Sequence, residues 1–247
     1  KREGMPSMRS MQFGGDAIIK NNERMYSCSF MHLSRWGRYK EAFYLLLSGC
    51  GVGYSAQYRH IEQLSEVKHI DRSDVCHYTI EDTIEGWADA LGYLLESYYG
   101  DRQCYVEFNY SKVRKEKAPL KTSGGKAPGH LPLKRCLENV RALMDGAQGR
   151  RIYTVEGSDI MCYGAEAVLA GGIRRASLLG LFSEDDSLMM YSKAAPNFAP
   201  TGMGAVNTHR EMVNISVALL RSTAKRETFD RALRVANSNY GCPGFYF

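Results

Sequence analysis

The fold of this chain is constrained most by the alternation of short β-prone segments with longer helical segments. Apolar residues alternate in the short segments and recur at three- and four-residue spacing in the longer ones. Strands are expected at residues 25–30, 105–110, 152–155, 173–182 and from 244 onward, and helices at residues 39–48, 79–98, 133–144, 160–169 and 228–237. The second helix is expected to open at Thr79, because residues 79–82 read TIED and resemble a capping box. Strands that alternate with helices are typical of an α/β fold with mainly parallel strands, and without a fixed repeat or an obvious linker we expect a single domain over residues 1–247.

Composition and charge limit the classes of protein to which this chain can belong. The 247 residues are 44% hydrophobic and 24% charged, as in an average globular domain. No apolar run approaches the roughly 18–20 residues that span a bilayer, and no secretory signal is visible, so we expect a cytoplasmic protein without a membrane partner. The net charge of +5 suits a protein that handles phosphates. Because the basic residues are dispersed and do not cluster with aromatic ones, no nucleic-acid partner is expected.

The cysteines indicate a reducing compartment. There are seven of them, at positions 28, 50, 76, 104, 136, 162 and 242, without tight repeated spacing. An odd number in a chain of this length does not predict a disulfide scaffold. With no CxxC and no paired Cys/His cluster, no structural zinc site or other metal site is expected.

Two glycine clusters do not match the common nucleotide-binding motifs. Gly49-x-Gly51-x-Gly53 follows a predicted helix, whereas the dinucleotide fingerprint follows a strand and opens a helix. Gly124-Gly125-Lys126 lacks the first glycine and the Ser or Thr of a phosphate-binding loop. Taken alone, each cluster predicts a tight turn, because glycine readily adopts positive φ.

Six motifs, taken together in their order and spacing, are more specific. They are MPSMR at residues 5–9, YSCSF at residues 26–30, LLLSGCGVGYS at residues 45–55, DTIEGW at residues 82–87, APLKTSGG at residues 118–125 and AGGIRRA at residues 170–176. In this arrangement the chain closely resembles the catalytic chain of ribonucleotide reductases, over residues 4–247. The resemblance is greatest to the monomeric adenosylcobalamin-dependent ribonucleoside-triphosphate reductases and their small phage-type relatives.

The resemblance implies the first part of a ten-stranded α/β barrel, built from two parallel five-stranded halves around a finger loop. A cysteine at the tip of that loop becomes a thiyl radical, and a second pair of cysteines supplies reducing equivalents. Cys28 matches the first cysteine of that pair, and a thiol suits this role because its thiolate can form a disulfide with a partner. The cysteines at positions 50, 76, 104, 136 and 162 are expected to be inert and buried.

The same resemblance implies two nucleotide sites. Ser27 and Ser7 match substrate-binding positions, Ser27 at a phosphate, while Gly51 and Gly53 match a turn whose backbone lies against the substrate nucleoside. Arg114 and Lys121 match basic residues that hold the phosphates of a deoxynucleoside triphosphate (dNTP) effector, and a triphosphate demands such charge. Asp82 matches an acidic residue near the effector sugar, although a plain helix cap is an equally good interpretation.

A third segment is implied to connect these two sites. The loop that passes effector identity to the substrate matches residues 170–176, with Ala170, Gly171, Gly172 and Arg174 as its candidate residues. Arg174 is the residue expected to sense the base.

The departures from the family pattern are as informative as the matches. The Asn-x-Cys-x-Glu pattern of the finger loop is absent, and Cys242 stands in the wrong context for it. Met5 occupies a position where some relatives have a hydroxyl residue. Because the chain also begins with Lys1, we expect a fragment or processed chain, roughly the first half of a reductase core, that needs the C-terminal half for activity.

Several alternatives stay open at this point. The radical would come from adenosylcobalamin or from a metal-containing, radical-generating partner subunit, and a thioredoxin-like protein would be the reductant. A non-catalytic nucleotide-binding module that keeps only the effector site is the main alternative of another class. A basic nucleic-acid-binding protein is the third, and the dispersed charges disfavour it.

Overall fold

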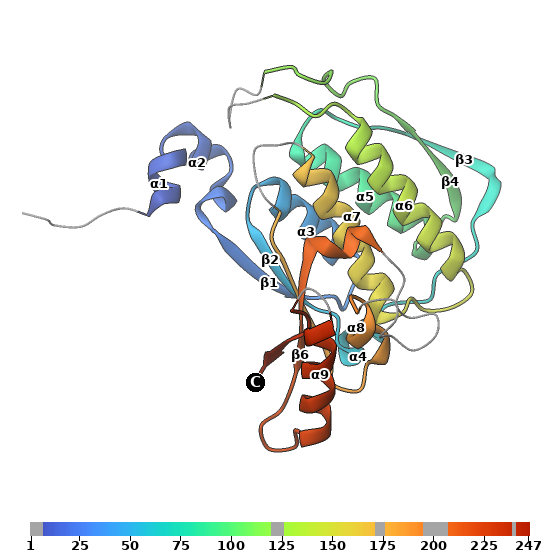
Figure 1. Ribbon diagram of the computed structural model, residues 1–247. Helices are drawn as coiled ribbons and strands as arrows, with labels where there is room; N and C mark the ends of the chain where they lie inside the picture. Colours follow the sequence, from blue (N-terminus) through green and yellow to red (C-terminus); the bar gives the residue numbers. More distant parts are fainter. Residues whose placement is uncertain (1–6, 120–125, 171–175, 195–206, 239–240) are drawn as a thin grey trace, which may run out of the picture.

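A five-stranded parallel sheet forms the centre of the computed structural model (Figure 1), which describes residues 7–119, 126–170, 176–194, 207–238 and 241–247. Its strands are β1 (Cys28–His32), β2 (Gly51–Ser55), β5 (Leu178–Ser183), β6 (Val213–Ala218) and β7 (Gly244–Tyr246). They lie in the order β1-β2-β5-β6-β7, and each neighbouring pair is parallel. The expected α/β class with parallel strands is therefore confirmed. Five strands are consistent with one half of a ten-stranded barrel, and the complete barrel stays a prediction.

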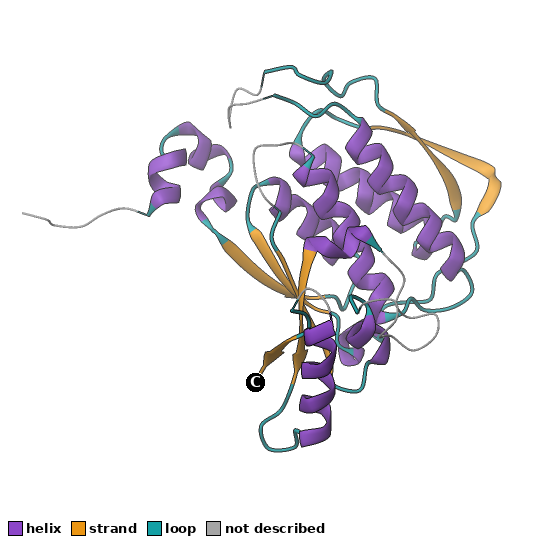
Figure 2. Cartoon of the chain, viewed as in Figure 1, coloured by secondary structure: helices purple, strands orange, loops and turns teal. Residues whose placement is uncertain are grey.

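Helices connect these strands (Figure 2), and a long excursion separates β2 from β5. Before the sheet come α1 (Met8–Phe13), α2 (Asp16–Lys20) and the 3₁₀ turn η1 (Asn22–Met25), and α3 (Gly37–Leu47) links β1 to β2. The excursion contains α4 (Tyr58–Ile61), β3 (Asp71–Thr79), α5 (Ile84–Tyr99), β4 (Cys104–Asn109), α6 (Leu131–Ala147) and α7 (Thr154–Leu169). The last connections hold α8 (Ser187–Tyr191), the 3₁₀ turn η2 (Thr208–Met212) and α9 (Arg226–Ser238). Within the described ranges, no helix has the length and apolar character needed to cross a membrane.

The core lies between one face of the large sheet and a layer of helices. In α3 the buried side chains Tyr39, Ala42, Phe43 and Leu46 recur at helical spacing, so one stripe of the helix faces inward. Helices α3 and α7 pack on the sheet, α5 packs on α3, and α6 packs on α7. Burial of each large apolar side chain contributes roughly 1.5–3 kcal/mol, so this layer supplies most of the driving force for folding.

The opposite face of the large sheet carries exposed apolar side chains. Along β1, burial alternates so that Cys28, Phe30 and His32 are exposed while Met31 is buried. Leu179 and Tyr246 are 41% and 56% exposed. Parallel sheets are ordinarily covered on both faces. This open face therefore suits contact with a further layer.

The structure corrects two boundaries expected from the sequence and adds strands that were not expected. Residues 152–155 are not a strand, because α7 begins at Thr154, and the Glu156 carboxylate accepts the Tyr153 N–H at 2.7 Å in a capping arrangement. Thr79 ends β3 instead of opening a helix; α5 begins at Ile84 after the N-cap residue Thr83. Strands β2, β3 and β6 have no counterpart among the strands predicted from the sequence. The helices expected near α3, α6 and α9 are confirmed.

Candidate substrate and effector sites

Three of the predicted substrate-site residues meet at the amino ends of β1 and β2. Cys28 is the first residue of β1 and a free, exposed thiol. It stands opposite Gly51 in the parallel register, and the Gly51 N–H donates to the Ser27 carbonyl at 2.8 Å. The structure thus brings Ser27, Cys28 and Gly51 together at one edge of the sheet.

The expectation that Gly51 and Gly53 form a turn is wrong. Both lie inside β2, where the ladder with β1 holds them extended, and the turn is made by Gly49 at φ +83°. A Cβ on Gly53 would approach the Phe30 ring to 2.8 Å, so a larger residue there would force this exposed ring to move. A Cβ on Gly51 would lie in ordinary contact, 3.5 Å from both the Ser27 carbonyl and the Ser177 side chain, so Gly51 is closely flanked by these two residues.

Ser7 lies on a different element from the other substrate-site residues. It is the N-cap of α1, where its hydroxyl accepts the Ser10 N–H at 3.1 Å. Arg9 of the same helix donates to the Gly49 carbonyl at 2.6 Å and so ties α1 to the turn before β2. The structure gives Ser7 a capping role, and its contact with substrate stays a prediction.

The predicted specificity loop is described only at its ends. Gly171, Gly172 and Arg174 lie outside the described residues, while Ala170 follows α7 and donates its N–H to the Glu166 carbonyl at 3.1 Å. Beyond the loop, the Ser177 carbonyl accepts the Val52 N–H at 2.9 Å. One end of the loop therefore joins the sheet one residue from Gly51. The sequence analysis missed Ser177, and its position inside the strand predicted over residues 173–182 was the available signal.

Two of the predicted effector residues pair with one another. Strands β3 and β4 are parallel, so the segments that follow them leave from the same end of this sheet. Arg114, after β4, donates from Nε to the Asp82 carboxylate at 2.7 Å, and Lys112 forms a hydrogen bond with Glu81. Lys121 lies outside the described residues.

Asp82 is not the cap of α5. That role belongs to Thr83, whose hydroxyl accepts the Gly86 N–H at 2.9 Å. The side chains of Asp82 and Arg114 are 31% and 39% exposed, and exposed ion pairs of this kind are weak. Residues 112–117 read KVRKEK, with four basic side chains and one acidic one, so a polyanion could displace the Asp82 contact.

The expectation that Cys76 and Cys104 are unpaired is wrong. They form a disulfide between β3 and β4, because the pairing of these strands brings their Cα atoms to 5.9 Å. The remaining described cysteines are free, and those at positions 50, 136, 162 and 242 are buried. Burial raises the pKa of Cys136 to about 12 and also raises that of Cys162, which fits the inert role expected for both.

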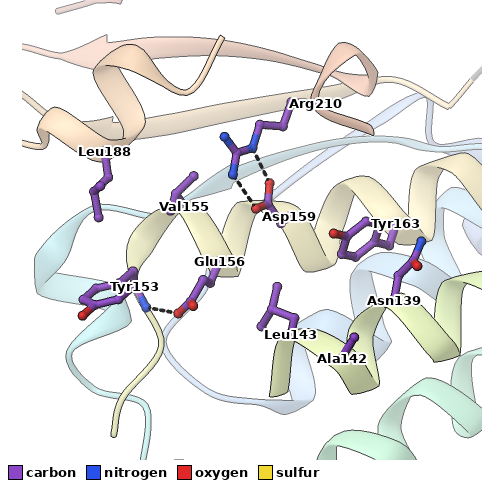
Figure 3. Close-up of a pocket in the computed structure, with 10 residues that line it drawn as sticks. All are labelled: Asn139, Ala142, Leu143, Tyr153, Val155, Glu156, Asp159, Tyr163, Leu188 and Arg210. Atoms are coloured by element: carbon purple, nitrogen blue, oxygen red, sulfur yellow. Dashed lines mark hydrogen bonds and ion pairs between the residues drawn. The ribbon is translucent and has the colours of Figure 1, made fainter. Parts of the chain in front are cut away.

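A pocket outside the predicted sites opens beside α6 and α7 (Figure 3). Its volume is about 740 Å³, and its lining includes Asn139, Tyr163, Asp159 and Arg210. Arg210 donates from Nε and Nη2 to the two carboxylate oxygens of Asp159, both at 2.7 Å, and from Nη1 to the Ser192 carbonyl. Burial acts to raise the pKa of Asp159, and hydrogen bonds from Arg210 and His209 outweigh it, so this pKa lies below its ordinary value. With its donors already used, Arg210 joins η2 to α7 and is a structural residue.

A histidine pair lies at the carboxyl ends of β1 and β2. The rings of His32 and His60 stack with centroids 4.1 Å apart, and His60 Nδ1 lies 2.8 Å from the Ser55 hydroxyl. Burial lowers the pKa of His60 to about 4, and electrostatic repulsion from His32 and Arg59 adds to this effect. His60 is therefore neutral near pH 7.

Comparisons with known proteins agree with this geometry. The family model described as B12-dependent ribonucleotide reductase, insertion domain, matches residues 54–144, which span β3, α5, β4 and most of α6. A Mycobacterium phage D29 protein named as an adenosylcobalamin-dependent ribonucleoside-triphosphate reductase is 28% identical, over 72% of this chain and 31% of its own length. The Euglena gracilis adenosylcobalamin-dependent ribonucleoside-triphosphate reductase is 30% identical, over 74% of this chain and 24% of its own. A crystal structure of a B12-dependent (class II) ribonucleotide reductase matches with a TM-score of 0.74 and 23% identity, over 88% of this chain and 36% of that one.

The sheet, its cysteine-bearing edge and these matches make the chain a relative of the ribonucleotide reductases. Within that family its matches are the B12-dependent, or class II, enzymes. The chain spans about a third or less of the length of these two relatives. Most of the family-model match, up to residue 144, falls in the excursion between β2 and β5.

Proposed function

We propose that this chain supplies the first half of the barrel, one redox cysteine and the effector site of an adenosylcobalamin-dependent ribonucleotide reductase. The observation that carries the proposal is the position of Cys28. Its thiol is exposed on the open face of a parallel sheet, beside Ser27 and Gly51. A reactive thiol needs such access, whereas the other free cysteines that the structure describes are buried.

Cys28 would act as one half of a dithiol. Reduction of a ribonucleotide removes the 2′ hydroxyl as water and takes up two electrons and two protons. Cys28 and a partner cysteine would supply both as their thiols close to a disulfide, and a thioredoxin-like dithiol would reopen it. The Ser27 hydroxyl would hold a phosphate oxygen, and the absence of a side chain at Gly51 would let the nucleoside approach the backbone.

Adenosylcobalamin would supply the radical that starts the reaction. The exposed ring of Phe30 and the exposed side chain of Leu179 fit the face of a large ring system, so these residues of the open face would contact the cofactor or the second half of the barrel. Excluding water from this face would protect the radical chemistry from side reactions.

Arg114, Lys121 and Asp82 would bind a dNTP effector, and residues 170–176 would pass its identity to the substrate. The Arg114–Asp82 pair supports this, because it places a cation and a carboxylate side by side for a triphosphate and a sugar hydroxyl. The junction of Ser177 with β2 supports the route from the loop to Cys28.

The test is the Cys28→Ser variant in an enzyme reconstituted with the C-terminal half. Multi-turnover reduction should fall by orders of magnitude while dNTP binding is retained. Cys50→Ala is the matched control, because Cys50 is a buried free cysteine near the same edge, and it should keep turnover. Full turnover of Cys28→Ser with a dithiol reductant would contradict the assignment.

A nucleotide-binding module without catalysis is the second candidate. It is favoured by one observation: Asp82 and Arg114 already lie side by side, whereas Cys28 is the one exposed free cysteine among the residues that the structure describes. The two candidates differ in a simple assay. If the reconstituted enzyme binds dNTPs but reduces no ribonucleotide with any radical source, the module is the correct function.

A further inference from the structure

The small sheet of β3 and β4 has little packing of its own. Its separate hydrophobic cluster contains three buried residues, Cys76, Cys104 and Val106, with Tyr78, Tyr93 and Phe108 packed against them. Figure 1 shows this two-stranded sheet at the far side of the helical layer from the open face of the large sheet. A pair of strands is marginally stable unless other contacts hold it.

The disulfide lies where the strand register is irregular. Asp71 stands opposite Cys104 and Val75 opposite Tyr105, so β3 contains a bulge between Asp71 and Val75. The covalent link between Cys76 and Cys104 spans this irregular region. It therefore fixes the register of the regular pairs that continue toward the loops.

Those pairs lead directly to the proposed effector residues. The ladder ends with Thr79 opposite Asn109, and Asp82 and Arg114 follow within a few residues. The exposed Asp82–Arg114 ion pair is too weak to hold the two loops in place by itself. Ile80 and Val113 anchor the two loops in the main core, and the order of the residues between these anchors also depends on the strands that the disulfide joins.

We propose that Cys76–Cys104 is a reversible thiol–disulfide site whose state sets the affinity of the effector loops for a dNTP. The proposal rests on the proposed effector function. A dithiol reductant of the thioredoxin type would attack one sulfur and pass through a mixed disulfide. The S–S bond breaks, two thiols form at Cys76 and Cys104, and the reductant becomes its own disulfide as two electrons and two protons are transferred.

Access and chemistry both suit a reversible bond. The two sulfurs are buried beneath the sheet surface, with Val75 beside them 37% exposed, so local opening of the two strands would expose them. Disulfides of intracellular proteins are mostly catalytic or redox-sensing. Because the proposed reaction consumes a dithiol reductant, this bond would meet that reductant in every active preparation.

The experiment compares oxidised and dithiothreitol-reduced protein by hydrogen exchange and by calorimetric titration with each of the four dNTPs. Reduction should speed exchange in residues 71–79 and 104–114 and weaken dNTP binding about fivefold or more. The double variant Cys76→Ala/Cys104→Ala should match the reduced protein and ignore the reductant. Cys50→Ala should respond to the reductant as the original chain does.

Each other outcome has a defined meaning. Free thiols at Cys76 and Cys104 after treatment with an oxidant, or equal exchange and equal dNTP affinity in both states, would overturn the proposal. Redox-dependent exchange without dNTP binding in either state would overturn the proposed effector site and, with it, the coupling. A response to reductant that persists in the double variant would assign the switch to another cysteine and also overturn it.

Discussion

The two parallel sheets of this molecule are stabilised in different ways. The five-stranded sheet is held by helices on one face and leaves the other face, with Cys28, Phe30 and Leu179, exposed. The two-stranded sheet packs on α5 through a much smaller cluster and carries a covalent bond as well. The difference suggests different roles for the two sheets. The large sheet would hold the reacting groups, and the small sheet would position the loops of the proposed effector site.

The largest expected effect on stability lies near the large sheet. Arg210→Ala would leave the buried Asp159 carboxylate without its main partner, and loss of one member of a buried pair costs about 3–5 kcal/mol. Because the pKa of Asp159 is depressed in the folded state, its stabilising effect is present at neutral pH and is lost as the pH falls below about 4. Urea unfolding of the variant at pH 7 measures the loss. An unchanged midpoint would show that η2 does not help to hold the helical layer.

The disulfide should stabilise the small sheet by a comparable amount. Cys76 and Cys104 are 28 positions apart, and closing a loop of this size contributes about 3.6 kcal/mol in the chain-entropy description. Reduction should therefore lower the thermal midpoint of the small sheet while the large sheet is little affected. Hydrogen exchange resolved by segment checks this. If both sheets lose protection together, the two regions form one cooperative unit.

Arg114→Ala tests the loops of the small sheet. Removal of a charged hydrogen-bond donor should weaken dNTP binding by about 1.5–3 kcal/mol. Stability should change little, because Arg114 and Asp82 form an exposed pair. Arg102→Ala is a matched control, since Arg102 forms an exposed pair with Asp74 on the same sheet, away from the loops. Calorimetry in which both variants bind alike would remove Arg114 from the site.

The smallest effect concerns the carboxyl ends of β1 and β2. The pKa of His60 is about 4, below its ordinary value, so the unfolded chain binds more protons than the folded chain between about pH 4 and 6.5. Stability should therefore fall as the pH drops through this window. His60→Gln should flatten the dependence there. Parallel curves for both proteins would show that His60 stays accessible to solvent.

The sequence predicts the large sheet better than the small one, and the reasons are physical. Most large-sheet strands and their helices show clear apolar periodicity because they border the core. β3 reads DRSDVCHYT and is mostly exposed, so its sequence carries little burial signal. A capping pattern is a local signal, and it predicts a helix that begins at Thr79. In the structure Thr79 belongs to β3, because it pairs with Asn109 of β4, and such non-local pairing is not visible in the local sequence.

The site residues were predictable to different degrees. Cys28, Ser27 and Gly51 came from the resemblance to reductases, and the register of β1 and β2 brings them together. The glycines were expected in a turn because glycine clusters usually form turns, yet the parallel ladder extends them. The Cys76–Cys104 bond could not be derived from spacing, since it depends on which strands are neighbours.

The junction of Ser177 with β2 has a consequence for mutagenesis. The contact is between main-chain atoms, from the Val52 N–H to the Ser177 carbonyl. Replacing either side chain leaves that hydrogen bond in place, so an alanine scan would pass over it. An alanine scan therefore cannot detect coupling that depends on a main-chain hydrogen bond. Replacing the Val52 amide by an ester removes the N–H donor and would test this hydrogen bond directly.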